Sequence, residues 1–179
     1  GVLMNNLPIV KYLVQNARAN INAVDDEYGQ TPFLWAAKNA NLEITRFLVE
    51  EKADVNAIDN EGMNALLRAI QYHNGLYYHK NDDTGNIDMV RYLVEDLKAD
   101  IESRDYQGFS GLLTAAVNGR SHNLLLHYLV KNAKANVNAK TNGPYYSNCY
   151  SCSKECYISS SFNEDAIPSM SRSKPSTPF

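Results

Sequence analysis

Cysteine is missing from residues 1–148 of this 179-residue chain, and its three cysteines all lie near the C-terminus: Cys149, Cys152 and Cys156. An odd count at one end excludes a disulfide framework and favours a reducing compartment, so we expect a cytoplasmic or nuclear protein rather than a secreted one. No apolar run approaches the ~18 residues that cross a membrane. The first residues also lack the charged segment and apolar stretch of a signal peptide.

The chain also has little excess of charge of either sign: its net charge is −3 and its isoelectric point is about 5.8. Without a basic field to hold a phosphate backbone, nucleic acid is disfavoured as the main partner. No nucleophile elbow, phosphate loop, HExxH segment or calcium loop occurs in the sequence. We therefore predict a chain that is not an enzyme and that holds no cofactor or metal.

What the sequence does contain is an internal repeat. The segment Ala-Asn-Ile-Asn at 19–22 recurs in related form at 53–56, 99–102 and 135–138. The intervals are 56 − 22 = 34, 102 − 56 = 46 and 138 − 102 = 36 residues. A second signature, Tyr-Leu-Val at 12–14, keeps step at 47–49, 92–94 and 128–130. A period near 34 residues is typical of a solenoid built from stacked units.

The second unit shows what each repeat is expected to form. Thr31 suits a helix N-cap, and Pro32 suits the first helical position, where its missing N–H costs nothing. Gly29 permits a tight turn just before them. One short helix pair cannot bury both of its faces, so stability must come from stacking on neighbouring units.

The residues of this unit resemble the ankyrin family. Residues 29–37, Gly-Gln-Thr-Pro-Phe-Leu-Trp-Ala-Ala, are similar to the family's opening G-x-T-P-L-H-x-A-A, and residues 52–57 are similar to its closing G-A-D-V-N-A. The family His is replaced by Leu34, Leu67 and Leu113. The resemblance covers about residues 6–140 and implies an all-α repeat solenoid of stacked helix-turn-helix units with hairpin turns.

We divide the chain accordingly. The predicted parts are a partial repeat with only its second helix (1–25), three repeats (26–58, 59–104 with an insertion at 73–84, and 105–140), and a poorly ordered, flexible tail (141–179). The tail holds ten serines and four of the six prolines without helical periodicity. Because the first unit lacks its partner helix, we expect the array to continue upstream. Its single helix is predicted to bury Ile9, Val10, Leu13 and Val14.

The end of each second helix departs from the family pattern. A basic residue, namely Arg18, Lys52, Lys98 or Lys134, stands where the family has a glycine in the left-handed conformation. The first, third and fourth repeats also carry one extra residue there, so we expect a differently formed cap in those repeats.

Several aromatic and sulfur-containing residues invite functional interpretation. The series Tyr12, Phe47, Tyr92 and Tyr128 recurs at one position of the repeat, which predicts core packing, and Trp35 is expected to pack between repeats. The three cysteines of the tail favour free thiols. A zinc site, a local disulfide or lipidation is the alternative. The insertion with Tyr77 and Tyr78 is either a tolerated surface loop or a binding loop.

The resemblance implies that a partner protein binds the concave face formed by the hairpin tips and first helices, and we predict a monomeric scaffold or adaptor of this kind. The alternatives are the targeting region of a larger enzyme or effector whose catalytic domain lies outside this chain, and a metal- or redox-responsive tail. Tyr28, Met63, Tyr106 and Phe109 are expected to be exposed there, and the acidic Asp26, Glu27 and Glu61 nearby favour a basic partner. The predicted partner-binding residues are Tyr28, Gln30, Glu61, Met63, Tyr72, Tyr77, Tyr78, Tyr106 and Phe109.

Overall fold

The computed structural model describes residues 1–2, 5–71, 84–118 and 123–141. These residues form short helices joined by hairpins and loops, and three of the helices end in a π-helical turn, labelled η. The elements are α1 (Leu7–Lys11), η1 (Tyr12–Asn16), α2 (Pro32–Lys38), α3 (Leu42–Glu50), α4 (Ala65–Gln71), α5 (Thr84–Arg91), η2 (Tyr92–Asp96), α6 (Gly111–Asn118), α7 (Asn123–His127) and η3 (Tyr128–Asn132). Within the described ranges, no helix is long and apolar enough to cross a membrane.

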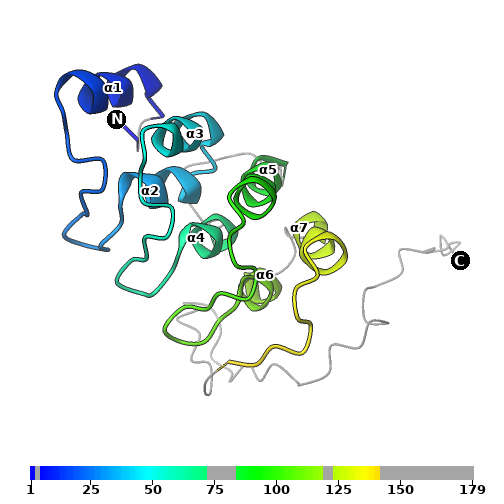
Figure 1. Ribbon diagram of the computed structural model, residues 1–179. Coiled ribbons are helices and arrows are strands. Elements are labelled where there is room, and N and C mark those ends of the chain that lie inside the picture. Colours follow the sequence, from blue (N-terminus) through cyan, green and yellow to red (C-terminus); the bar gives the residue numbers. More distant parts are fainter. Residues whose placement is uncertain (3–4, 72–83, 119–122, 142–179) are drawn as a thin grey trace, which may run out of the picture.

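The helices stand in two rows (Figure 1). The inner helices are α2, α4 and α6, each of which contacts the next. The outer helices are α1, α3, α5 and α7, with α1 packed on α3 and α5 on α7. A hairpin or loop leads into each inner helix from the same side of the stack. The all-helical repeat fold predicted from the sequence is therefore confirmed.

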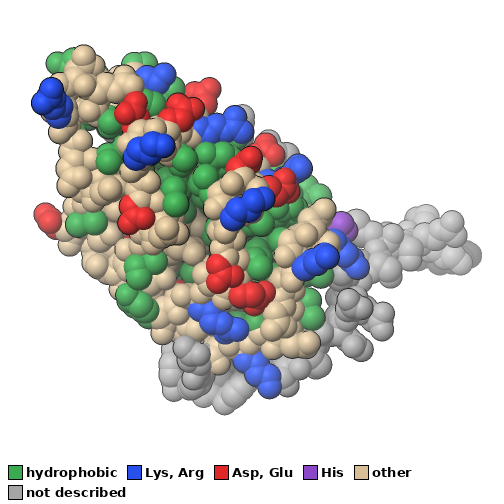
Figure 2. Space-filling view, viewed as in Figure 1, with side chains coloured by type: hydrophobic (Ala, Val, Ile, Leu, Met, Phe, Trp, Pro, Cys, Tyr) green, Lys and Arg blue, Asp and Glu red, His purple; other side chains and the backbone are tan. Residues whose placement is uncertain are grey.

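The hydrophobic core lies between the two rows of helices. Its largest fully buried side chains are Phe33, Leu34, Ile44, Leu48, Leu66, Leu67, Ile70, Met89, Leu93, Leu125 and Leu129. Each of them contributes roughly 1.5–3 kcal/mol through the apolar surface it buries. On the face shown in Figure 2, acidic and basic side chains lie beside one another over the helices rather than in separate fields.

The helices α2 and α3 are capped by the residues that the sequence indicates. Thr31 accepts a hydrogen bond from the amide of Leu34 at 3.3 Å, and Pro32 begins α2. At the end of α3, Lys52 takes the left-handed conformation with φ 69°. The amides of Lys52 and Ala53 donate to the carbonyls of Val49 and Leu48, which closes a Schellman motif.

The extra residue in three of the repeats explains the π-helical turns. In η1, η2 and η3 the closing amide, on Ala17, Leu97 or Ala133, donates to a carbonyl five residues earlier at 3.0–3.1 Å. The wider turn absorbs one residue and still brings the following basic residue to a left-handed φ of 52–58°. Repeat two lacks the extra residue, and its outer helix α3 is α-helical throughout. The expectation of a differently formed cap is confirmed.

The aromatic series is buried only in part. Phe47 and Tyr128 lie in the core, Tyr92 is half-buried, and Tyr12 is 63% exposed. The other three rings face the preceding unit: Lys11 Nζ lies 5.6 Å from the Phe47 ring, Arg46 lies 5.3 Å from the Tyr92 ring, and the Tyr128 hydroxyl donates to Glu95 at 3.0 Å. No described element packs on the outward side of the first unit. The core prediction is therefore wrong for Tyr12.

The predicted buried face of the first helix needs the same correction. Val10 is buried and Val14 is half-buried, as expected. Ile9 and Leu13, however, are 47% and 40% exposed, because they share the outward side of that unit.

The left-handed cap of α3 gives a stability prediction. Lys52→Gly is expected to raise the free energy of unfolding by something under about 1 kcal/mol, since glycine adopts φ 69° without a Cβ penalty. Thermal unfolding followed by circular dichroism measures the change. The control Glu50→Gly, at a right-handed position inside α3, should instead cost about 0.5–1 kcal/mol. A clear drop in melting temperature for Lys52→Gly contradicts the cap assignment.

Candidate functional site

Three hairpins project beside the inner helices, and each opens with an aspartate: Asp25, Asp59 or Asp105. In the third repeat, Asp59 Oδ1 accepts the amides of Glu61 and Met63 at 2.9 and 3.0 Å. In the fourth, Asp105 Oδ1 accepts the equivalent amides at 2.9 and 2.8 Å. These bonds close the turns around Gly62 and Gly108, and Asp25 Oδ1 accepts the amides of Glu27 and Tyr28 in the turn around Gly29. All three glycines have positive φ.

Successive hairpins are joined through their backbones. The amide of Asn60 donates to the carbonyl of Tyr28, and the amide of Tyr106 donates to that of Glu61, both at 3.0 Å. The stack also needs a glycine here, because a Cβ on Gly62 would lie 2.6 Å from the Tyr106 ring. The tips are thereby held side by side as one surface.

In the second and third repeats the other carboxylate oxygen, Oδ2, accepts a hydrogen bond from a side chain of the inner helix, and that side chain differs between the two repeats. The facing position is always six residues after the hairpin glycine: 35 − 29, 68 − 62 and 114 − 108. It is occupied by Trp35 in α2, Arg68 in α4 and Thr114 in α6. The three side chains differ in length and charge, so each repeat presents a different surface.

In the second repeat this position builds an aromatic cluster. Trp35 Nε1 donates to Asp25 Oδ2 at 2.8 Å, and its ring meets that of Tyr28 edge-on at 6.5 Å. Lys38 Nζ lies 4.5 Å from the Trp35 ring centre and 5.3 Å from that of Tyr28. Burial, followed by repulsion from Arg68, lowers the pKa of Lys38. Trp35 thus faces its own hairpin, unlike the packing between repeats that we expected.

Asp25 is held in its charged form by the same cluster. Burial on its own raises the pKa of the carboxyl, but hydrogen bonds from the Tyr28 amide, the Trp35 indole and the Gln30 and Glu27 amides outweigh it. The pKa of Asp25 therefore lies below its usual value.

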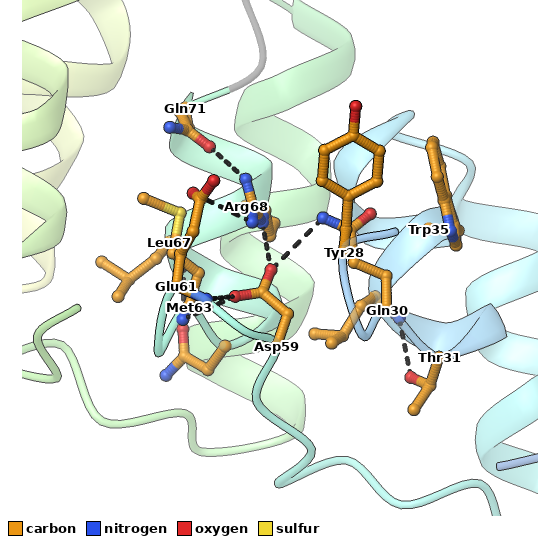
Figure 3. A network of polar contacts seen from close by, with 12 residues as sticks. Tyr28, Gln30, Thr31, Trp35, Asp59, Glu61, Met63, Leu67, Arg68 and Gln71 are labelled. Carbon is orange, nitrogen blue, oxygen red and sulfur yellow. Dashed lines mark hydrogen bonds and ion pairs between the residues drawn. The ribbon is translucent and has the colours of Figure 1, made fainter. Parts of the chain in front are cut away.

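In the third repeat the same position holds a buried ion pair (Figure 3). Arg68 is 4% exposed, and its Nε donates to Oδ2 of the buried Asp59. Nη1 donates to Gln71 Oε1 at 2.7 Å. Nη2 lies 3.1 Å from Glu61 Oε2 as an ion pair without the alignment of a hydrogen bond. Arg68 therefore orients both Glu61 and Gln71.

In the fourth repeat Thr114 is too short to reach its aspartate. Among the described residues, no hydrogen bond reaches Oδ2 of Asp105. An open hollow of about 380 Å³ lies between the third and fourth hairpins and the inner helices. It is lined by Asn60, Glu61, Met63, Gln71, Asp105, Tyr106, Gln107, Phe109, Thr114 and Val117. The hollow combines two carboxylates with apolar walls.

Comparison with known proteins agrees with this geometry. Residues 2–105 match a family model described as ankyrin repeats in three copies. The chain belongs to the ankyrin-repeat family.

Curated relatives align with this ankyrin array over part of their length. The chain is 32% identical to Palmitoyltransferase AKR1 of Lachancea kluyveri, over 79% of this chain and 17% of the relative. It is 32% identical to Ankyrin repeat and SAM domain-containing protein 6 of Rattus norvegicus, over 60% of this chain and 11% of the relative. Palmitoyltransferase akr1 of Schizosaccharomyces pombe is 44% identical over 31% of this chain and 8% of the relative. The chain thus spans less than a fifth of these relatives.

The ankyrin hairpins expose some of the predicted partner-binding residues. Tyr28 and Tyr106 are 38% and 68% exposed, and the Glu61 side chain is 55% exposed. Tyr72, Tyr77 and Tyr78 lie outside the described residues, as do the three cysteines and most of the insertion. Among the described residues, no group of three or more His, Cys, Asp or Glu side chains is placed to hold a metal ion.

The expected exposure of Met63 and Phe109 is wrong, and Gln30 is buried with them. Their exposed fractions are 5%, 6% and 1%. Each follows the hairpin glycine and has its side chain turned away from solvent, and Gln30 Nε2 donates to Asp59 Oδ2 of the next repeat at 3.2 Å. Only small parts of Met63 and Phe109 reach the hollow.

The sequence analysis did not identify Asp59, Arg68 and Thr114 as residues that determine the form and charge of this surface. The signal that identifies them is the fixed spacing of six residues from the glycine to the facing position.

The buried ion pair gives a second stability prediction. Arg68→Met should lower the free energy of unfolding by about 3 kcal/mol, because it leaves the Asp59 carboxylate buried without its counter-ion. Urea unfolding measures the loss. Arg46→Met serves as control and should cost less than about 1 kcal/mol, since the contact of this exposed arginine among the described residues is a cation–π contact 5.3 Å from the Tyr92 ring. Equal losses for both variants contradict the role assigned to Arg68.

Proposed function

We propose that this chain is a non-catalytic ankyrin module that binds another protein through its hairpins and inner helices. The hollow between the third and fourth repeats, flanked by exposed Tyr106, carries this proposal. Tyrosine is enriched among the residues that dominate binding energy at interfaces, and Tyr28 and Tyr106 are held there by a surface that the backbone already fixes. The acidic Glu61 between them favours a partner with basic character.

The module is further proposed to act as a monomer in the cytoplasm or nucleus, without a cofactor and without nucleic acid as its partner. The confinement of cysteine to residues 149–156 and the net charge of −3 support this proposal.

A second candidate function is the targeting region of a larger enzyme. Its support is that two of the three relatives described above are named palmitoyltransferases and that the chain spans only 17% and 8% of them. In that arrangement the ankyrin array would select or position a protein for an enzyme domain elsewhere, and no described residue would take part in the chemistry. The hairpin surface would serve both functions in the same way.

Affinity capture tests the proposed surface. The immobilised chain is compared with a Tyr28→Ser, Tyr106→Ser variant, whose substitutions lie at exposed positions and should preserve the fold. Mass spectrometry should show that the variant captures at least tenfold less of each partner than the unmodified chain does. Circular dichroism confirms that the variant is folded.

The matched control changes the outer helices instead. Leu124, 57% exposed on α7, and Glu50, exposed on α3, are replaced together by alanine. This variant should capture the same partners as the unmodified chain. If the outer-helix variant loses them while the tyrosine variant keeps them, the hairpins are not the binding surface.

A further inference from the structure

We propose that the hollow between the third and fourth repeats receives an arginine side chain from the partner protein. This inference rests on the proposed protein-binding function and specifies the chemistry of that partner. The chain itself supplies the precedent, because an arginine occupies the equivalent place one repeat earlier.

The precedent is the Arg68 site. There, a guanidinium bonds to the hairpin aspartate Asp59 of the same repeat, while its remaining nitrogens face Gln71 and Glu61. The fourth repeat keeps the aspartate, as Asp105, and keeps its turn hydrogen bonds. It replaces the arginine with Thr114, and the space that the longer side chain would fill is part of the hollow. A guanidinium from outside could therefore bond to Asp105 as Arg68 bonds to Asp59.

The lining of the hollow suits the whole length of an arginine. Met63, Phe109 and Val117 offer apolar contact to the aliphatic stem. Glu61 and Asp105 offer carboxylates to the charged head, and no described lining residue is basic. Tyr106 stands exposed beside them, where a guanidinium can lie against its ring.

Arginine fits this site better than lysine. A planar guanidinium has five N–H donors and can bond to Asp105 while facing Glu61, whereas an ammonium acts as a single point charge. Glu61 is already held from its other side by Arg68. An incoming arginine would extend the series to Arg68, Glu61, the partner arginine and Asp105, in which the signs of charge alternate.

The test uses the full chain and N-acetyl-arginine methylamide as the probe, followed by NMR of backbone amides and methionine methyl groups. Signals of Met63, Phe109, Thr114 and Val117 should shift and saturate, with a dissociation constant on the order of 1 mM for so small a ligand. The citrulline analogue has nearly the same shape without the charge and should bind at least tenfold more weakly. Equal shifts with both probes, or shifts confined to other residues, overturn the proposal.

Two variants sharpen the test. Thr114→Arg should fill the hollow from within, pair with Asp105 and abolish binding of the probe. Asp105→Asn retains the Oδ1 acceptor that closes the turn but removes the charge, and should weaken binding at least fivefold. If both variants are folded and bind the probe as the unmodified chain does, the assignment to Asp105 is wrong.

This test is separable from that of the proposed function. Should the probe fail to bind while captured partners still depend on Tyr28 and Tyr106, the arginine assignment fails and the protein-binding function stands. Should the tyrosine variant lose no partner, the proposed surface fails whatever the probe does.

Discussion

The aspartate at the start of each hairpin is the residue on which this surface depends. A hairpin that is not part of a sheet leaves backbone amides without partners, and buried donors of that kind are costly. Oδ1 of Asp59 and of Asp105 accepts two such amides each, which fixes the turn beside a left-handed glycine. Because each tip then bonds to the backbone of the one before it, the same carboxylates set the positions of Tyr28, Glu61 and Tyr106.

The remaining oxygen of each carboxylate gives the repeats their different characters. The Trp35 indole and the Arg68 guanidinium donate to it in the second and third repeats, whereas Thr114 holds the same position in the fourth repeat and makes no such bond. The second repeat consequently presents an aromatic and cationic cluster, and the third presents a closed ion pair. The fourth presents a hollow, because the facing side chain is too short to fill it. The three repeats thus share one backbone arrangement and differ in surface because of the residue six positions after the hairpin glycine.

Local rules in the sequence predicted most of the fold. The Thr31 cap, the left-handed Lys52 and the altered ends of the other outer helices all follow from residue types and from a count of residues between signatures. Burial at the edges of the stack was harder to predict. Tyr12 resembles Phe47 in sequence, but its exposure depends on whether another unit packs against it. Met63 was placed at the exposed tip, yet the glycine before it directs its side chain inward.

A stack of this kind confines the effect of each residue to its neighbours, since the main contacts between the described helices join each repeat to the adjacent one. The hollow in the fourth repeat can therefore change without disturbing the Trp35 cluster in the second. Specificity for a partner can be tuned at the facing positions while the core between the helix rows stays the same. This separation holds whether the array acts alone or is joined to an enzyme, because the proposed binding surface consists of the hairpins and the inner helices in either case.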